Sequence, residues 1–140
     1  MIILDTNVLS EVLKPQPNKD VLAWMGRIAI SRLFTTTITE AEIRFGVARL
    51  LDGQRKDALS TVIGGMFSVD FENRILPFDS PAAQAYALIT ASRDRIGRPI
   101  SQLDAQIAAI AQSCGGEIAT RNDGDFYECG VVIINPWELA

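Results

Sequence analysis

Apolar residues recur along this chain with two different spacings. Short runs of apolar or β-branched residues, which are typical of buried strands, occupy positions 2–4, 33–36, 75–78, 117–120 and 131–134. Between these runs, apolar residues recur every three or four positions, which is the spacing of a helix that buries one face. Strands that alternate with such helices are typical of a parallel sheet with helices on both faces. We therefore predict an α/β fold, a three-layer α/β/α sandwich around a central parallel sheet of four to five strands.

The helical segments carry residues that commonly start or stop helices. The predicted helices are one over 8–13 that ends by Pro15, one capped by Asn18, one that starts at Thr39 and stops near Gly53, one over 55–68, one after Ser80-Pro81 with Pro at the first helical position, and one over 102–114. The pair Gly64-Gly65 weakens the fourth of these helices. Helical spacing also places Leu51, Leu103 and Cys114 among the residues that face the core.

Length and composition indicate a single folded domain over residues 1–140. The chain is 48% hydrophobic and 21% charged, as ordinary globular proteins are. Asp5 interrupts the first apolar run and no basic residue precedes it, so we expect no secretory signal, and no segment is apolar enough to span a membrane. Cys114 and Cys129 lack the spacing of a metal site or disulfide framework. We therefore expect reduced thiols and a cytoplasmic protein.

Charge and the absence of histidine narrow the possible chemistry. Thirteen basic and seventeen acidic residues give a net charge of −4, which argues against a broad basic surface that wraps nucleic acid. The chain contains no histidine, which excludes Ser-His-Asp triads, imidazole-pair RNA cleavage and histidine-ligated metal sites. Any catalysis therefore relies on carboxylates, on other polar side chains or on a metal ion.

Acidic residues stand at the ends of predicted strands and the starts of predicted helices. Asp5 directly follows the first strand, Glu42 and Asp104 lie in the first turns of two helices, and the polar stretch TRNDGDF at 120–126 follows the fourth strand. In open α/β sheets, ligands bind beyond the carboxyl ends of the strands, where the strand order reverses. These acids are therefore expected to share one edge of the sheet.

Each of these acids also has a simpler interpretation as a helix cap. Asp5 suits the N-cap of the following helix. Glu42 comes three residues after Thr39, and Asp104 comes three residues after Ser101, which is the spacing of a capping box. Both interpretations remain open for each residue taken alone.

Several carboxylates in one cleft would repel one another unless a cation joined them. Mg²⁺ binds through one or two carboxylates and keeps several waters, so the pattern suggests a magnesium site and phosphate chemistry. Arg121 is a candidate for contact with a phosphate, and Arg44, Arg49 and Arg98 are weaker candidates. Thr6, Asn7 and Thr120 are expected to orient carboxylates or bound waters, or else to cap helices.

Gly46 lies one turn after Glu42 on the same helix. Glycine inside a helix is unfavourable by about 1 kcal/mol relative to alanine, so a close approach should compensate. Close packing of another helix is the commoner cause, and admission of a substrate backbone is the alternative.

Four blocks in this order resemble the PIN-domain ribonucleases. They are LDTNVLSE at 4–11, TEAEIRFGVARL at 39–50, DAQIAAIA at 104–111 and ATRNDGDF at 119–126. The blocks, together with the closing NPWEL, resemble more narrowly the VapC-type toxins of bacterial toxin–antitoxin pairs, in their FitB-like branch. The resemblance covers nearly the whole chain. It implies a PIN-like fold and cleavage of RNA that depends on Mg²⁺ or Mn²⁺.

The resemblance also assigns roles to individual residues. It implies that Asp5, Glu42 and Asp104 form the acidic triad around the metal. Related sequences place a fourth acid at the position of Asn122 or at that of Asp125. We favour Asp125, with Asn122 orienting a water and Asp123 as the spare, and the number of metal ions stays open.

The resemblance further implies partners. The family implies homodimers and a cognate antitoxin that inserts a segment into the acidic cleft, with a higher assembly in that complex and operator DNA bound only through the antitoxin. A metal-dependent endoribonuclease toxin is therefore our leading hypothesis. The alternatives are a catalytically silent partner-binding module, whose acids are only caps, and another Mg²⁺-dependent phosphoryl-transfer domain. A dehalogenase-like site of that last kind needs a second Asp where Asn7 stands.

Overall fold

The fold is built on one parallel sheet. The computed structural model describes residues 1–139. Its five strands are β1 (Ile2–Leu4), β2 (Leu33–Thr36), β3 (Ile75–Leu76), β4 (Glu117–Ala119) and β5 (Ile133–Ile134), in the order β3-β2-β1-β4-β5. The chain therefore begins in the middle of the sheet and builds outward first on one side and then on the other. That order confirms the predicted α/β class and places the reversal of strand order at β1.

Consecutive apolar residues in β1 serve two separate cores. Ile2 and Leu4 pack into one hydrophobic cluster, and Ile3 packs into the other. Successive side chains of a strand point to opposite faces of the sheet, so a strand covered on both faces needs apolar residues at every position. Burial on both faces therefore explains why residues 2–4 are all apolar.

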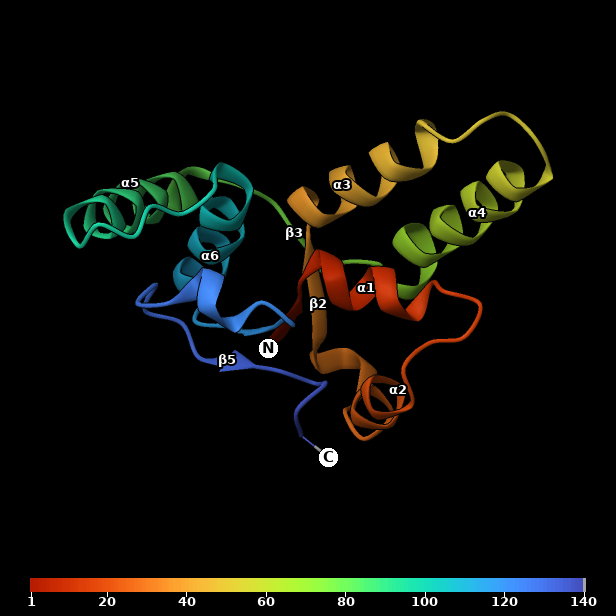
Figure 1. The fold of residues 1–140 in the computed structure, drawn as a ribbon, viewed down its shortest axis with the longest axis horizontal. Coiled ribbons are helices and arrows are strands. Elements are labelled where there is room, and N and C mark those ends of the chain that lie inside the picture. Colours follow the sequence, from red (N-terminus) through yellow and green to blue (C-terminus); the bar gives the residue numbers. More distant parts are fainter. Residues whose placement is uncertain (140) are drawn as a thin grey trace.

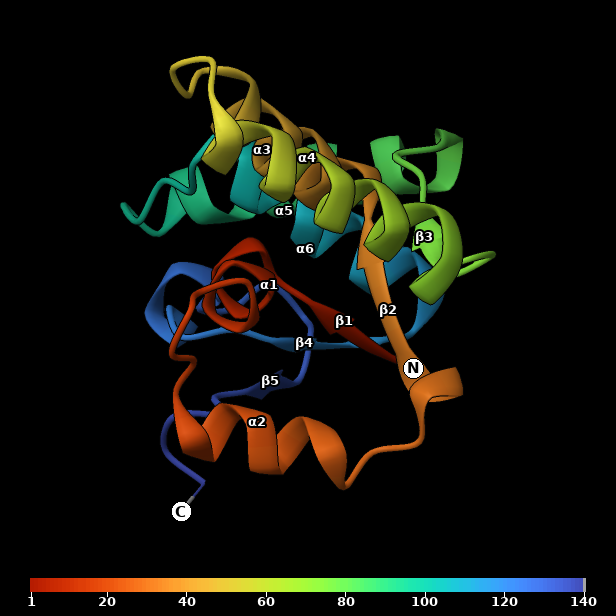
Figure 2. The same cartoon turned by 90° about the vertical axis from the view of Figure 1, so that its right-hand side faces the viewer.

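Helices cover both faces. They are α1 (Thr6–Val12), α2 (Lys19–Gly26), α3 (Thr37–Ala48), α4 (Gln54–Gly65), α5 (Ser80–Arg95) and α6 (Gln102–Cys114), with short helices η1 (Ile30–Arg32), η2 (Met66–Asp70) and η3 (Asp123–Phe126). Figure 1 shows α5 and α6 on one side of the sheet and α1 and α2 on the other. In Figure 2, α3 and α4 run side by side. In the part of the chain that the structure describes, no helix combines the length and apolar character needed to cross a membrane.

The structure corrects several predicted helix ends. Helix α3 begins at Thr37 and not at Thr39, because the hydroxyl of Thr36 accepts the Thr39 amide and serves as the N-cap. Gly53 precedes α4, whereas α3 already ends at Ala48.

Two further helices differ in their ends. Helix α4 runs through Gly64-Gly65 and continues as a π-helical turn, so the glycines do not break it. Asp79 caps α5, which places Pro81 at its second residue, a position in the first turn that still needs no amide donor.

Three residues predicted to face the core are exposed. Leu51 is 93% exposed because it lies in the turn after α3, where helical periodicity no longer applies. Leu103 and Cys114 stand near the two ends of α6, whose buried residues all lie between Ala105 and Ala111. Periodicity therefore identified the direction of the buried stripe of α6 but not where it stops.

Candidate functional site

A cavity of about 420 Å³ lies beyond the carboxyl ends of β1 and β4. This is the place where the strand order reverses, as expected for a ligand site in an open α/β sheet. The residues that line it come from α1, α3, α6, the segment after β4 and the C-terminal segment: Asp5, Thr6, Asn7, Ser10, Glu11, Lys14, Glu42, Asp104, Arg121, Asn122 and Trp137. The three acids of the predicted triad therefore share one cavity.

Asp5 is held in place through both of its carboxylate oxygens. Oδ1 accepts the backbone N–H of Thr6 at 2.8 Å, which makes Asp5 the N-cap of α1. Oδ2 accepts the hydroxyl of Thr120 at 2.8 Å and Nδ2 of Asn7 at 3.3 Å. Asp5 therefore caps α1, as predicted, and it also lines the cavity.

The hydroxyl of Thr120 joins the end of β4 to α1. Besides donating to Asp5, it accepts Nδ2 of Asn7 at 3.1 Å and the backbone N–H of Asn122 at 3.1 Å. The amide oxygen of Asn7 in turn accepts the backbone N–H of Arg121 at 3.2 Å. These bonds fix the direction in which the chain leaves β4 and thereby bring Asn122 to the cavity wall.

Glu42 is positioned by α1 and does not cap its own helix. Its Oε1 accepts the hydroxyl of Thr6 at 2.9 Å, and that hydroxyl also lies 3.0 Å from Oγ1 of Thr39. The capping-box interpretation of Glu42 is therefore wrong, because Thr36 caps α3 and Glu42 points toward α1. Thr6 ties the starts of α1 and α3 together beside the cavity.

Asp104 lies in the first turn of α6 and also lines the cavity. The hydroxyl of Ser101 accepts its backbone N–H at 3.2 Å, so Ser101 is the N-cap, as its spacing predicted. Burial is the main cause that raises the pKa of Asp104, and the negative charge of Asp125 raises it further, whereas the Ser101 hydroxyl and Arg93 lower it.

The burial of Asp5 has a larger electrostatic effect. Burial raises the pKa of Asp5 from 3.8 to about 6, although hydrogen bonds from Thr120 and Thr6 favour the ionised form. The charges of Asp104 and Glu42 raise it further. The charges of Asp104 and Glu42 therefore act on Asp5 at this cavity, and a bound cation would offset them.

Three predicted site residues, Asn122, Asp123 and Asp125, lie in the segment after β4, and the structure places them differently. Asn122 lines the cavity, whereas Asp123 and Asp125 lie in η3, are exposed and are not among the lining residues. Asp125 is near enough to Asp104 to influence it electrostatically. The structure thus brings Asn122 into the cavity and leaves Asp125 beside it.

The predicted arginines fall into two groups. Arg121 lines the cavity, and its guanidinium lies 5.2 Å from the centroid of the Trp137 ring. Arg44 pairs with Glu40 at 2.8 Å, and Arg49 and Arg98 lie over Phe45 and Tyr127. These other arginines do not line the cavity, so Arg121 is the one predicted arginine that the fold places there.

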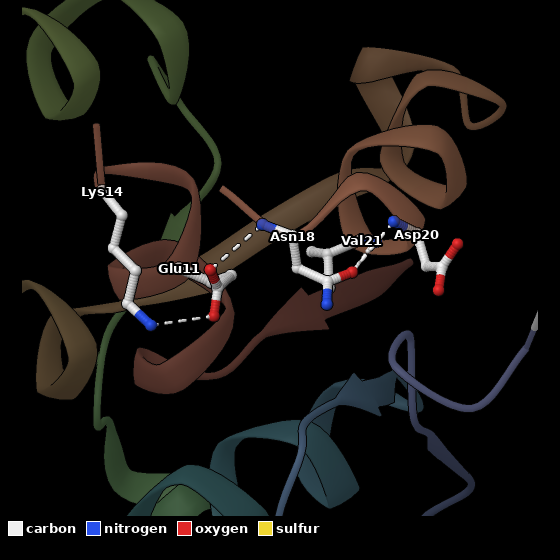
Figure 3. A network of polar contacts seen from close by, with 5 residues as sticks. All are labelled: Glu11, Lys14, Asn18, Asp20 and Val21. Atoms are coloured by element: carbon white, nitrogen blue, oxygen red, sulfur yellow. Dashed lines mark hydrogen bonds and ion pairs between the residues drawn. The ribbon is translucent and has the colours of Figure 1, made fainter. Parts of the chain in front are cut away.

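Glu11, Lys14 and Trp137 line the cavity but were not predicted as site residues. Glu11 is buried, pairs with Lys14 at 3.1 Å and accepts the backbone N–H of Asn18 at 3.1 Å, as Figure 3 shows. The hydrogen bond from Lys14 is the main cause that lowers the pKa of Glu11. Glu11 lies one helical turn after Asn7, a spacing that could have identified it, but no local pattern brings Trp137 from position 137 to the same cavity.

The donor set suits a hydrated hard cation. Among residues 1–139, no three potential ligands from His, Cys, Asp and Glu come close enough together to hold an ion directly. Mutual repulsion between ionised carboxylates favours such a spread arrangement. Mg²⁺ needs only one or two carboxylates, with waters in its other positions, so Asp5, Glu42 and Asp104 around one cavity are compatible with it.

A second cavity of about 510 Å³ adjoins the first between α1, α3 and α4. The two share Thr6, Ser10, Lys14 and Glu42. The rest of its lining is largely apolar: Leu13, Pro15, Ile43, Gly46, Val47, Arg55, Ala58, Leu59 and Val62. A Cβ atom added to Gly46 would meet nothing within 4 Å, so close helix packing, the commoner cause predicted for this glycine, is wrong.

Comparison with known proteins gives a consistent result. The family model of the PIN domain matches residues 2–131. The chain is 42% identical to Toxin FitB of Neisseria gonorrhoeae over 98% of this chain and 99% of that protein, and 41% identical to VapC ribonuclease Y4jK of Sinorhizobium fredii over 100% of both. It superposes on a chain in the structure of FitAB bound to an IR36 DNA fragment with a TM-score of 0.95, at 42% identity, covering 100% of this chain and 98% of that chain. The segment matched by the family model contains every acidic residue that lines the first cavity.

The raised pKa of Asp5 predicts how stability depends on pH. Between pH 3.8 and about 6 the folded state retains a proton that the unfolded state releases, so this group makes the protein less stable as pH rises through that interval, by up to about 3 kcal/mol. Asp5→Asn removes this titration, so the variant should not lose this stability as pH rises. The free energy of unfolding of the variant minus that of wild type should therefore increase between pH 4 and 6.5 and stay constant above pH 7. Urea melts in chelator at each pH measure the difference. The control Asp52→Asn changes a side chain that is 97% exposed and makes only a surface ion pair with Lys56, so its difference from wild type should stay small at every pH. A constant difference for Asp5→Asn over the same range would contradict the assignment.

Proposed function

The chain belongs to the PIN-domain family, and from this we propose that it is a divalent-metal-dependent endoribonuclease that acts as the toxin of a toxin–antitoxin pair. The observation that carries the proposal is the meeting of Asp5, Glu42 and Asp104 at one cavity beyond β1 and β4. The name of a relative, VapC ribonuclease, supports RNA as the substrate. We expect it to act in the cytoplasm.

The acids of the first cavity take the catalytic role. In this proposal Asp5, Glu42 and Asp104 hold Mg²⁺ or Mn²⁺, and Asp125 is the fourth acid, beside Asp104. When bound, the ion supplies a more acidic water and neutralises charge on the phosphate. Thr120 keeps Asp5 at the cavity wall by donating to the oxygen that does not cap α1.

The neighbouring polar groups position the substrate. Asn7 and Thr6 orient Asp5 and Glu42 through the hydrogen bonds already described. Asn122 presents its side chain at the cavity, where it orients water, and Asp123 is the alternative acid of that loop. Arg121 stands at the same cavity and contacts a phosphate of the RNA, since a guanidinium can donate two hydrogen bonds to phosphate oxygens.

We propose that the antitoxin segment that enters the acidic cavity also occupies the second cavity. Its apolar lining suits the side chains of a peptide, and it opens beside Glu42, which it shares with the acidic cavity. Gly46 lines it with open space around its Cα, which leaves room for a peptide backbone. A relative of this chain forms the FitAB complex on DNA, which supports a protein partner that carries the contact with operator DNA.

A homodimer is the proposed state of the free protein, with a higher assembly in the antitoxin complex. Large apolar side chains remain exposed on one chain, among them Phe45 on α3 and Leu88 on α5. Dimer interfaces commonly bury exposed apolar side chains of this kind.

RNA cleavage tests the catalytic proposal. The purified protein should cleave RNA with Mg²⁺ or Mn²⁺ and lose that activity in chelator. Asp5→Asn should lower the rate by more than about 100-fold, because even residues that only support metal ligands typically contribute 10- to 100-fold. Asp52→Asn is the matched control. Metal-independent cleavage, or full activity of Asp5→Asn, would refute the proposal, and a protein that binds no divalent ion would instead fit the silent partner-binding module.

A charge placed in the second cavity should disrupt the antitoxin complex. Val62→Arg puts a guanidinium at a valine that lines the cavity and is 53% exposed in the free chain. It should weaken binding of the cognate antitoxin by at least about tenfold, since a bound segment would cover that charge and desolvate it. The control is Val69→Arg, at a valine that is 69% exposed and does not line the cavity. Calorimetric titration of both variants measures the difference. Equal affinities would place the antitoxin elsewhere.

The mass in solution tests the dimer. Sedimentation equilibrium without antitoxin should give twice the 15.3 kDa of one chain. A single-chain mass at micromolar concentration would show that the exposed apolar side chains do not join two copies.

A further inference from the structure

Arg93 on α5 is a buried cation without an anionic partner. It is 4% exposed, and no carboxylate of residues 1–139 lies within ion-pairing distance of it. Burial of an unpaired charge is costly, so its hydrogen bonds must offset a large desolvation penalty.

The guanidinium of Arg93 binds backbone carbonyls from two separate segments. Nε donates to the carbonyl of Arg98 at 2.6 Å, in the connection between α5 and α6. Nη1 donates to the carbonyls of Asp125 at 2.9 Å and Tyr127 at 3.0 Å, and lies 3.5 Å from Sγ of Cys129. Arg93 therefore clamps the segment 123–129 against the chain that leads into α6.

Both clamped segments carry an acid of the proposed site. The connection that contains Arg98 leads to Asp104 in the first turn of α6, and η3 contains Asp125. Asp104 lies within electrostatic reach of both Arg93 and Asp125. A second contact joins the same two segments, since the guanidinium of Arg98 lies 4.1 Å from the centroid of the Tyr127 ring.

We propose that Arg93 is a positioning residue that fixes Asp125 relative to Asp104 and thereby sets the affinity of the site for a divalent ion. The inference rests on the proposed function, because it concerns the metal site of the same cavity. A fork of several fixed N–H donors is needed for carbonyls that diverge in this way, which a lysine ammonium does not reproduce. Phe126 anchors this short helix in the core, but Asp125 itself is exposed, and its own carbonyl is one of the groups that Arg93 holds, so the clamp restrains the backbone that carries the Asp125 carboxylate.

Metal affinity and stability, measured separately, test this role. Arg93→Met should weaken Mn²⁺ binding by about tenfold or more in calorimetry, as typical for groups that orient ligands. Arg95→Met, an exposed arginine two residues along α5, is the control and should bind Mn²⁺ as wild type does. Arg93→Lys keeps the charge and should lose affinity to an intermediate degree, and it serves as the test variant if Arg93→Met does not fold.

A double-mutant cycle separates positioning from general support of the fold. In an Asp125→Asn background, Arg93→Met should cause no further loss of Mn²⁺ affinity, whereas its effect on the urea midpoint should be the same in both backgrounds. Equal affinity losses in the two backgrounds, or wild-type affinity in a folded Arg93 variant, would overturn the inference while leaving the proposed function intact. A wild-type protein that binds no Mn²⁺ would overturn both.

Discussion

The site depends on one constraint, a carboxylate buried at the end of the central strand. Asp5 is 4% exposed and accepts hydrogen bonds from Thr6, Thr120 and Asn7, yet burial still raises its pKa to about 6. These three uncharged hydrogen-bond donors orient the Asp5 carboxylate but supply no positive charge to balance it. The parallel register of β4 beside β1 brings Thr120 to Asp5, and Asp5 in turn caps the start of α1. Sheet order, helix start and site geometry are therefore parts of one arrangement.

In this arrangement the needs of stability and of function conflict. Protonated carboxyls would not repel one another, but a metal site needs ionised carboxylates around one cavity. Glu11 shows the contrasting solution: Lys14 and the Asn18 amide satisfy its charge, so its pKa falls where that of Asp5 rises. Glu11 is thus already paired with a cation, whereas Asp5, Glu42 and Asp104 have no ion pair within the described residues and can bind a cationic ligand.

Much of this could be predicted from the sequence because the signals were local. The double burial of β1 appears as an uninterrupted apolar run, and α6 has a serine cap and a glycine stop at its predicted ends. The start of α3 was misplaced because Thr36, Thr37 and Thr39 offer similar hydroxyls, and only the fold decides which one faces the free amides. Trp137 and Arg93 act across long chain separations or from inside a helix, so no spacing rule pointed to them.

The pairing of residues near opposite ends of the chain also determines when the site can exist. The hydrogen bond between Asp5 and Thr120 joins positions 115 residues apart, and Trp137 follows later still. Contacts of such long separation form late, because loop-closure entropy must be overcome first. During synthesis, β1 therefore waits without its β4 neighbour until most of the chain has left the ribosome. A growing chain of this protein therefore has no complete acidic cavity until Thr120 and Trp137 have been synthesised.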